Sequence, residues 1–152
     1  MIDDIIAIIE NPENHAHRRD SVSKAIETLG QLRAQEGIDV LTKYIGYPWL
    51  TYHGHKRGYF GYGVSTYPAP ELTPAVKSLV AIGEPCVPKV IRKLTEANNR
   101  FELNACIAVL QQLSDRKSVV EQLRSALAEA SEKERRLLER ALKKINRDVP
   151  AN

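Results

Sequence analysis

All four histidines of the chain occur in two His-x-His pairs, His15/His17 and His53/His55. In an extended segment the side chains alternate between two faces, so both members of a pair would share one face and could bind a divalent metal ion. A complete site would need the two pairs to converge, or one pair to be joined by a carboxylate such as that of Glu13. We interpret both pairs as solvated side chains, and we predict neither a metal nor another cofactor.

The two cysteines, Cys86 and Cys106, lie within apolar helical patterns and lack the Cys-x-x-Cys spacing of redox or metal sites. This setting predicts small core residues in a reducing compartment. The sequence contains no Gly-x-Ser-x-Gly, no His-Glu-x-x-His and no phosphate-binding Gly-x-x-x-x-Gly-Lys-Ser/Thr motif. We therefore predict that the protein is not an enzyme.

Eight of the chain's nine aromatic residues lie between Tyr44 and Tyr67, in a stretch that is also rich in glycine. Aromatic residues normally spread through a core, because each buries a large apolar area. Their concentration in one segment allows two interpretations: the rings plug one end of the structure, or they form a platform that binds a partner. The residues that we expect to be contact anchors are Trp49, Tyr52, Tyr59, Phe60 and Tyr62.

The glycines and prolines of this aromatic stretch forbid a continuous helix. Two β-favouring runs, Leu50–His55 and Tyr59–Val64, are separated by three residues. We expect an inserted loop or a small β-hairpin at this place.

The net charge of +3 is unevenly distributed along the chain. Residues 1–50 carry five Lys/Arg and eight Asp/Glu, a balance of −3, whereas residues 51–152 carry seventeen and eleven, a balance of +6. This asymmetry would steer an acidic partner toward the C-terminal half. The basic residues that we expect to contribute to partner binding are Lys89, Arg92, Lys93 and Arg124.

Segments of helical periodicity recur through the chain. Residues 25–45, 75–94 and 106–127 each show apolar residues at helical spacing, a short break, and a second amphipathic helix. Each of these units is therefore predicted to be a helical hairpin. A further helix is predicted from about 132 to 147, and a short one at residues 2–9 is expected to cover the first hairpin.

The spacing of the units locates an insertion. Leu32, Ile82 and Leu113 occupy equivalent positions, so the intervals are 50 and 31 residues, and the surplus is 50 − 31 = 19. We place the extra material at about residues 46–70. A period in the thirties of paired helices is typical of an α-solenoid, in which each unit buries its apolar face against its neighbours.

Helix boundaries carry local signals that agree with these units. Thr73, Asn99 and Ser131 are predicted N-caps, and Gly83 is a predicted helix terminator. In the last helix, Glu139 and Lys143 have the i,i+4 spacing of an ion pair.

The string AIGEPCVPKVI at residues 81–91 resembles the turn of a bacterial HEAT repeat, in which Gly-x-Pro-x-Val-Pro links the two helices. The turns at Leu29-Gly30 and Leu113-Ser114-Asp115 are similar but looser. The resemblance implies a HEAT-like α-solenoid over nearly the whole chain outside 46–70. It implies little about function, because the family includes scaffolds, adaptors, chromophore lyases and relatives of DNA glycosylases.

The densest basic cluster lies in the predicted C-terminal helix. We interpret it as the polar outer face of a terminal capping repeat, which solubility requires. The cluster consists of Lys133, Arg135, Arg136, Arg140, Lys143, Lys144 and Arg147.

We thus expect a single all-α domain, 1–152, built as a HEAT-like solenoid with one aromatic insertion. The predicted function is a non-catalytic scaffold or adaptor that binds another protein, one with an acidic surface, through the concave second-helix face and the insertion. The alternatives are a nucleic-acid-binding protein that uses the basic concave face and the insert, and a chromophore- or metal-handling protein. The apolar runs are too short to span a membrane, and no secretory signal is evident, so we expect a cytoplasmic protein. A homodimer is compatible with the sequence, which names neither the partner nor the oligomeric state.

Overall fold

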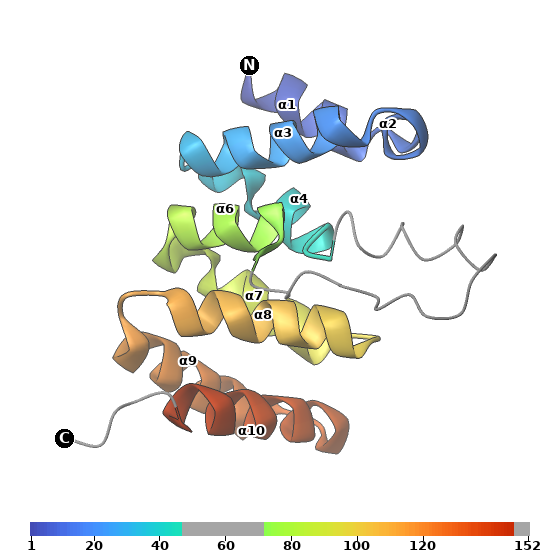
Figure 1. Cartoon of the computed structure of the whole chain (residues 1–152). Helices are drawn as coiled ribbons and strands as arrows, with labels where there is room; N and C mark the ends of the chain where they lie inside the picture. Colours follow the sequence, from blue (N-terminus) through green and yellow to red (C-terminus); the bar gives the residue numbers. More distant parts are fainter. Residues whose placement is uncertain (47–71, 148–152) are drawn as a thin grey trace, which may run out of the picture.

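The computed structural model describes residues 1–46 and 72–147, and these ranges contain helices and no strand (Figure 1). The predicted all-α class is confirmed for this part of the chain. The α-helices are α1 Ile2–Glu10, α2 Pro12–His17, α3 Arg19–Gln31, α4 Ile38–Lys43, α6 Pro74–Ile82, α7 Val87–Thr95, α8 Arg100–Gln112, α9 Arg116–Glu129 and α10 Glu132–Arg147, with short 3-10 helices η1 Gln35–Gly37 and η3 Glu84–Cys86.

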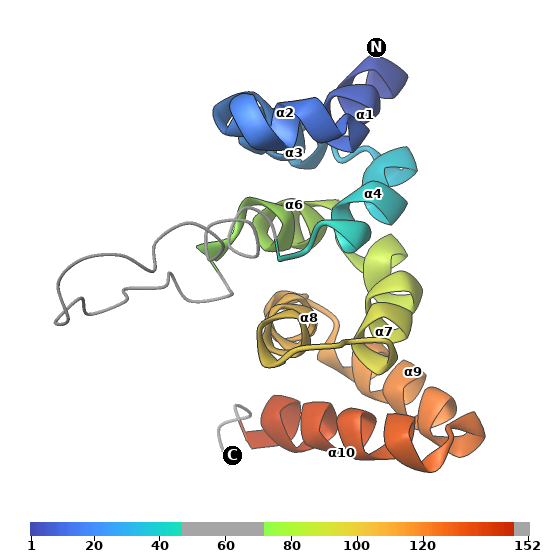
Figure 2. The ribbon, with the colours of Figure 1, turned by 90° about the vertical axis from the view of Figure 1, so that its right-hand side faces the viewer.

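The helices are arranged in two layers, which the side view separates (Figure 2). One layer contains α3, α6, α8 and α10, and each of these helices contacts the next. The other layer contains α4, α7 and α9, again with contacts between successive members. At the N-terminal end α1 packs against α3, as predicted for the helix at residues 2–9. The first and second helices of the predicted units thus lie in different layers.

The apolar faces of both layers meet in one continuous core. This explains the helical spacing of apolar residues in the sequence, because every i, i+3, i+4 stripe is turned toward the opposite layer. Both cysteines lie in this core, as predicted. The largest fully buried side chains are Ile9, Ile26, Leu29, Leu41, Ile45, Leu79, Leu94, Ile107, Leu110, Leu123, Leu138 and Ile145.

Two of the three predicted N-caps, Thr73 and Asn99, accept hydrogen bonds from backbone amides, whereas at Ser131 the Glu134 carboxylate accepts from the Ser131 amide at 2.8 Å. Thr73 Oγ1 accepts from the Val76 amide at 3.4 Å, and Asn99 Oδ1 accepts from the Glu102 amide at 2.9 Å. Gly83, which ends α6, has φ +89° and ψ −150°, a region that only glycine visits readily. These local interactions fix where helices begin and end.

The prediction of a HEAT-like turn at Leu29-Gly30 is wrong. Gly30 is buried within α3, and the chain turns three residues later, at Arg33, whose φ is +49°. There the Arg33 amide donates to the Gly30 carbonyl and the Ala34 amide to the Leu29 carbonyl, both at 3.0 Å, which is a Schellman termination. Arg33 thus takes the left-handed position at which a glycine would be expected, and Gly30 serves a packing role.

The two described ranges approach each other in the core at Ile45 and Thr73. Thr73 Oγ1 donates a hydrogen bond to the Ile45 carbonyl across 3.4 Å, and both residues are fully buried. The predicted insertion at about 46–70 and its β-hairpin lie, apart from Gly46, outside the described residues.

Candidate partner-binding face

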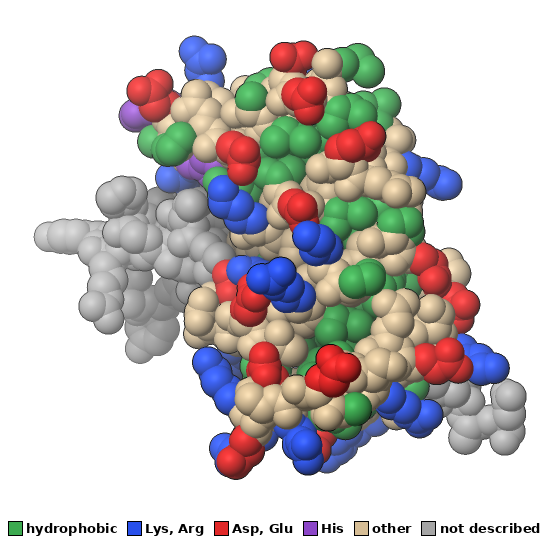
Figure 3. Space-filling model, turned by 180° about the vertical axis from the view of Figure 1, so that it is seen from behind, with side chains coloured by type: hydrophobic (Ala, Val, Ile, Leu, Met, Phe, Trp, Pro, Cys, Tyr) green, Lys and Arg blue, Asp and Glu red, His purple; other side chains and the backbone are tan. Residues whose placement is uncertain are grey.

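The layer formed by α4, α7 and α9 presents a face of mixed charge. Seen from this side, Lys and Arg side chains alternate with Asp and Glu, and hydrophobic side chains show between them (Figure 3). This is the second-helix face on which the sequence predicts partner contacts. It contains two hollows, one on each side of α7.

The first hollow lies between α4 and α7 and has a volume of about 290 Å³. Four cationic and two anionic side chains line it, so its formal charge is +2. Three of the predicted partner-binding residues, Lys89, Arg92 and Lys93, are among them. The full lining is Asp39, Thr42, Lys43, Lys89, Arg92, Lys93 and Glu96.

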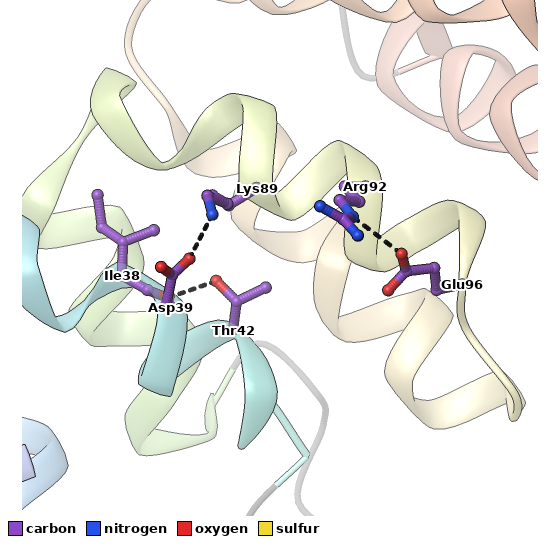
Figure 4. Close-up of polar contacts among 6 residues, drawn as sticks. All are labelled: Ile38, Asp39, Thr42, Lys89, Arg92 and Glu96. Carbon is purple, nitrogen blue, oxygen red and sulfur yellow. Dashed lines mark hydrogen bonds and ion pairs between the residues drawn. The ribbon is translucent and has the colours of Figure 1, made fainter.

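Two ion pairs at this hollow are open to solvent (Figure 4). Lys89 Nζ lies 2.7 Å from Asp39 Oδ1 and joins α7 to α4, with side chains 50% and 74% exposed. Arg92 Nε lies 3.0 Å from Glu96 Oε1 one turn further along α7. Exposed pairs of this kind contribute only about 0–1 kcal/mol each. An incoming carboxylate can therefore replace either internal partner at little cost in free energy.

Lys93 is held differently from its neighbours on α7. Its Nζ lies 3.5 Å from Glu102 Oε1 of α8, and the two side chains are only 20% and 11% exposed. Glu102 Oε2 also accepts a hydrogen bond from the Asn98 amide at 3.3 Å. The pair connects the two layers, so Lys93 both lines the hollow and holds α7 against α8.

The second hollow lies between α7 and α9 and has a volume of about 540 Å³. Its apolar part is formed by Pro88, Ile91 and Ala126, and Ile91 is buried. Polar side chains of α9 complete the lining: Ser118, Glu121, Gln122 and Ser125. The fourth predicted basic residue, Arg124, is exposed on α9 and lines neither hollow.

The α4 side of the first hollow was not predicted from the sequence. Asp39, Thr42 and Lys43 line it together with the residues of α7. A signal was nevertheless present, because the 50-residue interval between the first two units places these three positions in register with Lys89, Arg92 and Lys93. The repeat register therefore identifies facing positions on adjacent second helices.

The interpretation of His15 as a solvated side chain is wrong, and His15 and His17 do not share one face. His15 and His17 lie in α2, where residues two apart point about 160° away from each other, so the extended-segment argument does not apply to them. His15 Nε2 instead lies 2.5 Å from the Ile9 carbonyl, and its ring stacks on Tyr44 with centroids 4.9 Å apart. Across 1–46 and 72–147, no group of three His, Cys, Asp or Glu side chains is placed to hold a metal ion.

The remaining predicted site residues fall between the two described ranges. The aromatic anchors and the second histidine pair therefore stay predictions. They are Trp49, Tyr52, Tyr59, Phe60 and Tyr62, and His53 and His55.

The cysteine thiols are held in a form that disfavours nucleophilic chemistry. Burial raises the pKa of the Cys86 thiol and that of the Cys106 thiol from 9.0 to about 12. Cys86 Sγ also donates to the Leu79 carbonyl at 3.5 Å. Because the thiolate is the reactive form, neither thiol is suited to nucleophilic catalysis near neutral pH.

These buried thiols predict a pH dependence of stability. Above pH 9 the unfolded chain releases thiol protons that the folded chain retains, so stability is expected to fall as the pH rises toward 12. The decrease is up to about 1.4 kcal/mol per pH unit for each thiol. Urea unfolding at pH 8 and pH 10 should show a larger loss for the native chain than for a Cys86→Ala/Cys106→Ala variant. Equal losses for the two proteins would contradict this assignment.

The site has to be interpreted from its own geometry. No family model matches the chain, and searches of curated proteins and of solved structures found no match either. None of the described helices combines the length and the apolar character needed to cross a bilayer. The two hollows beside α7 are therefore the basis for the functional conclusion.

Proposed function

We propose that the protein is a non-catalytic scaffold or adaptor with a HEAT-like solenoid architecture. Its partner is another protein, bound by the α4/α7/α9 face together with the aromatic insertion at about 46–70. The two-layer arrangement supports the architecture, since successive helices pack within each layer as stacked repeats do. The Gly83–Pro88 turn, which joins α6 to α7 through a short 3-10 helix, agrees with the HEAT resemblance.

The observation that carries the proposal is the pairing of a cationic hollow with an apolar one. The two lie on opposite sides of α7, so they are separated by about 10 Å, the diameter of a helix with its side chains. A partner segment that places an acidic and an apolar side chain at this separation would fill both. On a partner helix, residues i and i+7 have this spacing.

The mixed charge of the face favours a protein over a nucleic acid as the partner. Lys89 and Arg92 each lie beside a carboxylate, and Glu96 and Glu121 line the hollows themselves. A phosphate backbone would be repelled by these carboxylates along its whole length. A protein surface can instead match both signs of charge, which gives specificity and fixes the orientation of binding.

Charge reversal on the face tests this proposal. A Lys89→Glu/Arg92→Glu variant is expected to lose the partner in affinity capture from native cytoplasm, with recovery reduced at least about tenfold. The matched control is Lys24→Glu/Lys77→Glu, which makes the same charge change at exposed positions of the other layer. Capture of the same partner by the face variant, or equal loss in the control, would refute the proposal.

The aromatic insertion is tested separately. Replacing Tyr59, Phe60 and Tyr62 with alanine is expected to abolish partner capture while the far-ultraviolet circular dichroism of the helices stays unchanged, because aromatic anchors dominate interface energies. A chain in which residues 46–71 are replaced by a short Gly/Ser linker should behave likewise. Loss of helicity in the triple variant would instead establish that the rings plug the structure.

A further inference from the structure

Helix α10, which forms one end of the helical stack, has an apolar buried side and a basic exposed side. Leu138, Ala141 and Ile145 are buried against α7, α8 and α9. The opposite side of α10 faces away from the other helices, at the lower end of the ribbon in Figure 1. Lys and Arg side chains gather at this end in the space-filling view (Figure 3). This outer side lies on a different part of the molecule from the two hollows beside α7.

Four exposed cations form a straight stripe on the outer side of α10. Arg136, Arg140, Lys143 and Arg147 occupy positions i, i+4, i+7 and i+11, which fall within an arc of about 60°. The stripe is about 16 Å long, at 1.5 Å of rise per residue. We refer to these four residues as the α10 stripe.

The charges of the α10 stripe are weakly neutralised. Arg136 is paired with Glu132 at 2.5 Å, but in the described residues no carboxylate lies within 4.0 Å of the cationic groups of Arg140, Lys143 or Arg147. The predicted Glu139–Lys143 ion pair is therefore not formed. With seven Lys/Arg and three Glu, α10 as a whole carries +4. This contrasts with the α4/α7 hollow, where Lys89 and Arg92 both have a carboxylate within 3.0 Å.

We propose that the α10 stripe binds the phosphate backbone of a nucleic acid without sequence preference. Three of its four members are arginines, whose planar guanidinium groups suit phosphate oxygens. A double helix carries one phosphate charge per about 1.7 Å of its axis, so a stripe of about 16 Å faces a continuous row of them.

The geometry disfavours the other classes of acidic partner. The stripe contains no apolar side chain, so a protein partner would find no anchor of the kind that dominates protein interfaces. The apolar side of α10 is buried in the core, so the helix cannot insert into a lipid surface as amphipathic membrane helices do. A linear array of positive charge also matches the linear phosphate backbone of a nucleic acid better than the planar surface of an anionic membrane.

The binding of the full-length chain to a fluorescein-labelled 20-base-pair duplex of arbitrary sequence, followed by fluorescence anisotropy, tests the inference. With four phosphates neutralised, the logarithm of the association constant should fall with the logarithm of salt at a slope of about −3.6, a loss of roughly 100-fold between 50 and 200 mM. An Arg136→Gln/Arg140→Gln/Lys143→Gln/Arg147→Gln variant should bind at least about tenfold more weakly at 50 mM salt and show a slope near zero.

The matched control removes four exposed cations outside both α10 and the α4/α7/α9 face, through Arg18→Gln, Lys24→Gln, Lys77→Gln and Arg100→Gln, and should keep the native affinity and slope. Circular dichroism of both variants verifies that the helices are intact. Equal losses in the two variants would show a general effect of net charge and overturn the inference. Binding to anionic phospholipid vesicles but not to the duplex would overturn it in favour of a membrane. Neither result would bear on partner capture by the α4/α7/α9 face.

Discussion

Replacing Gly30 with alanine is expected to lower the free energy of unfolding by about 2–3 kcal/mol, through overpacking at the contact between α3 and α6. A Cβ atom at this position would lie 2.5 Å from Ser78 Oγ and 2.6 Å from Ser78 Cα. The hydroxyl can rotate away but the backbone atom cannot, so the two helices must separate. Ser78 Oγ also donates to the Ile26 carbonyl at 2.9 Å, and separation would break this bond.

The sign of this effect makes it diagnostic. A glycine-to-alanine change inside a helix ordinarily stabilises by roughly 0.5–1 kcal/mol, so a loss of stability isolates the close approach of α3 and α6 as its cause. Gly37→Ala is the matched control, because the nearest atoms there are the Leu29 methyl groups at 3.0 and 3.3 Å, which can shift. Urea unfolding followed by circular dichroism gives both values. A Gly30→Ala protein as stable as the native chain would rule out the tight crossing.

Replacing Lys93 with methionine is expected to destabilise the protein by about 2–4 kcal/mol. The change leaves the carboxylate of Glu102, 11% exposed, without the ammonium group 3.5 Å away. Breaking a fully buried pair in this way costs about 3–5 kcal/mol, and the remaining exposure reduces that figure somewhat. The loss comes from the stranded charge on Glu102 rather than from the missing lysine.

A double-mutant cycle separates these two causes. A Lys93→Met/Glu102→Gln protein should recover most of the lost stability, because the amide oxygen of glutamine can still accept from the Asn98 amide without carrying a charge. Lys89→Met is the matched control on the same helix, since its ion pair with Asp39 is 50% and 74% exposed and should be worth less than about 1 kcal/mol. Similar losses for Lys93→Met and Lys89→Met would disprove a structural role for the buried pair.

The helices themselves could be predicted from the sequence because their signals are local. The bounds of α10 agree with the predicted 132–147, where Leu138, Ala141 and Ile145 repeat at helical spacing. Thr73 and Asn99 cap the helices that follow them through hydrogen bonds within three residues. Such interactions depend only on the neighbouring sequence, and so they can be recognised without knowledge of the packing.

The features that could not be predicted from the sequence depend on how closely the helices pack against each other. Gly30 resembles a turn residue in sequence, but the surface of α6 makes it a packing residue. The cationic hollow forms only because α4 and α7 lie side by side, which the sequence does not state. Lys89 and Lys93 lie one turn apart on α7, and their sequence positions did not reveal that the first is exposed and the second mostly buried. The positive charge of α10 is evident from the sequence, but which of its cations has a carboxylate partner depends on where the side chains lie.

The hydrogen bond between Thr73 and the Ile45 carbonyl holds two residues that are 28 positions apart in the sequence at neighbouring points of the core. For a flexible segment whose two ends are fixed at neighbouring points, loop-closure entropy costs about 0.6 kcal/mol for each doubling of its length. The closeness of Ile45 and Thr73 therefore sets no large entropic limit on the length of chain that joins them.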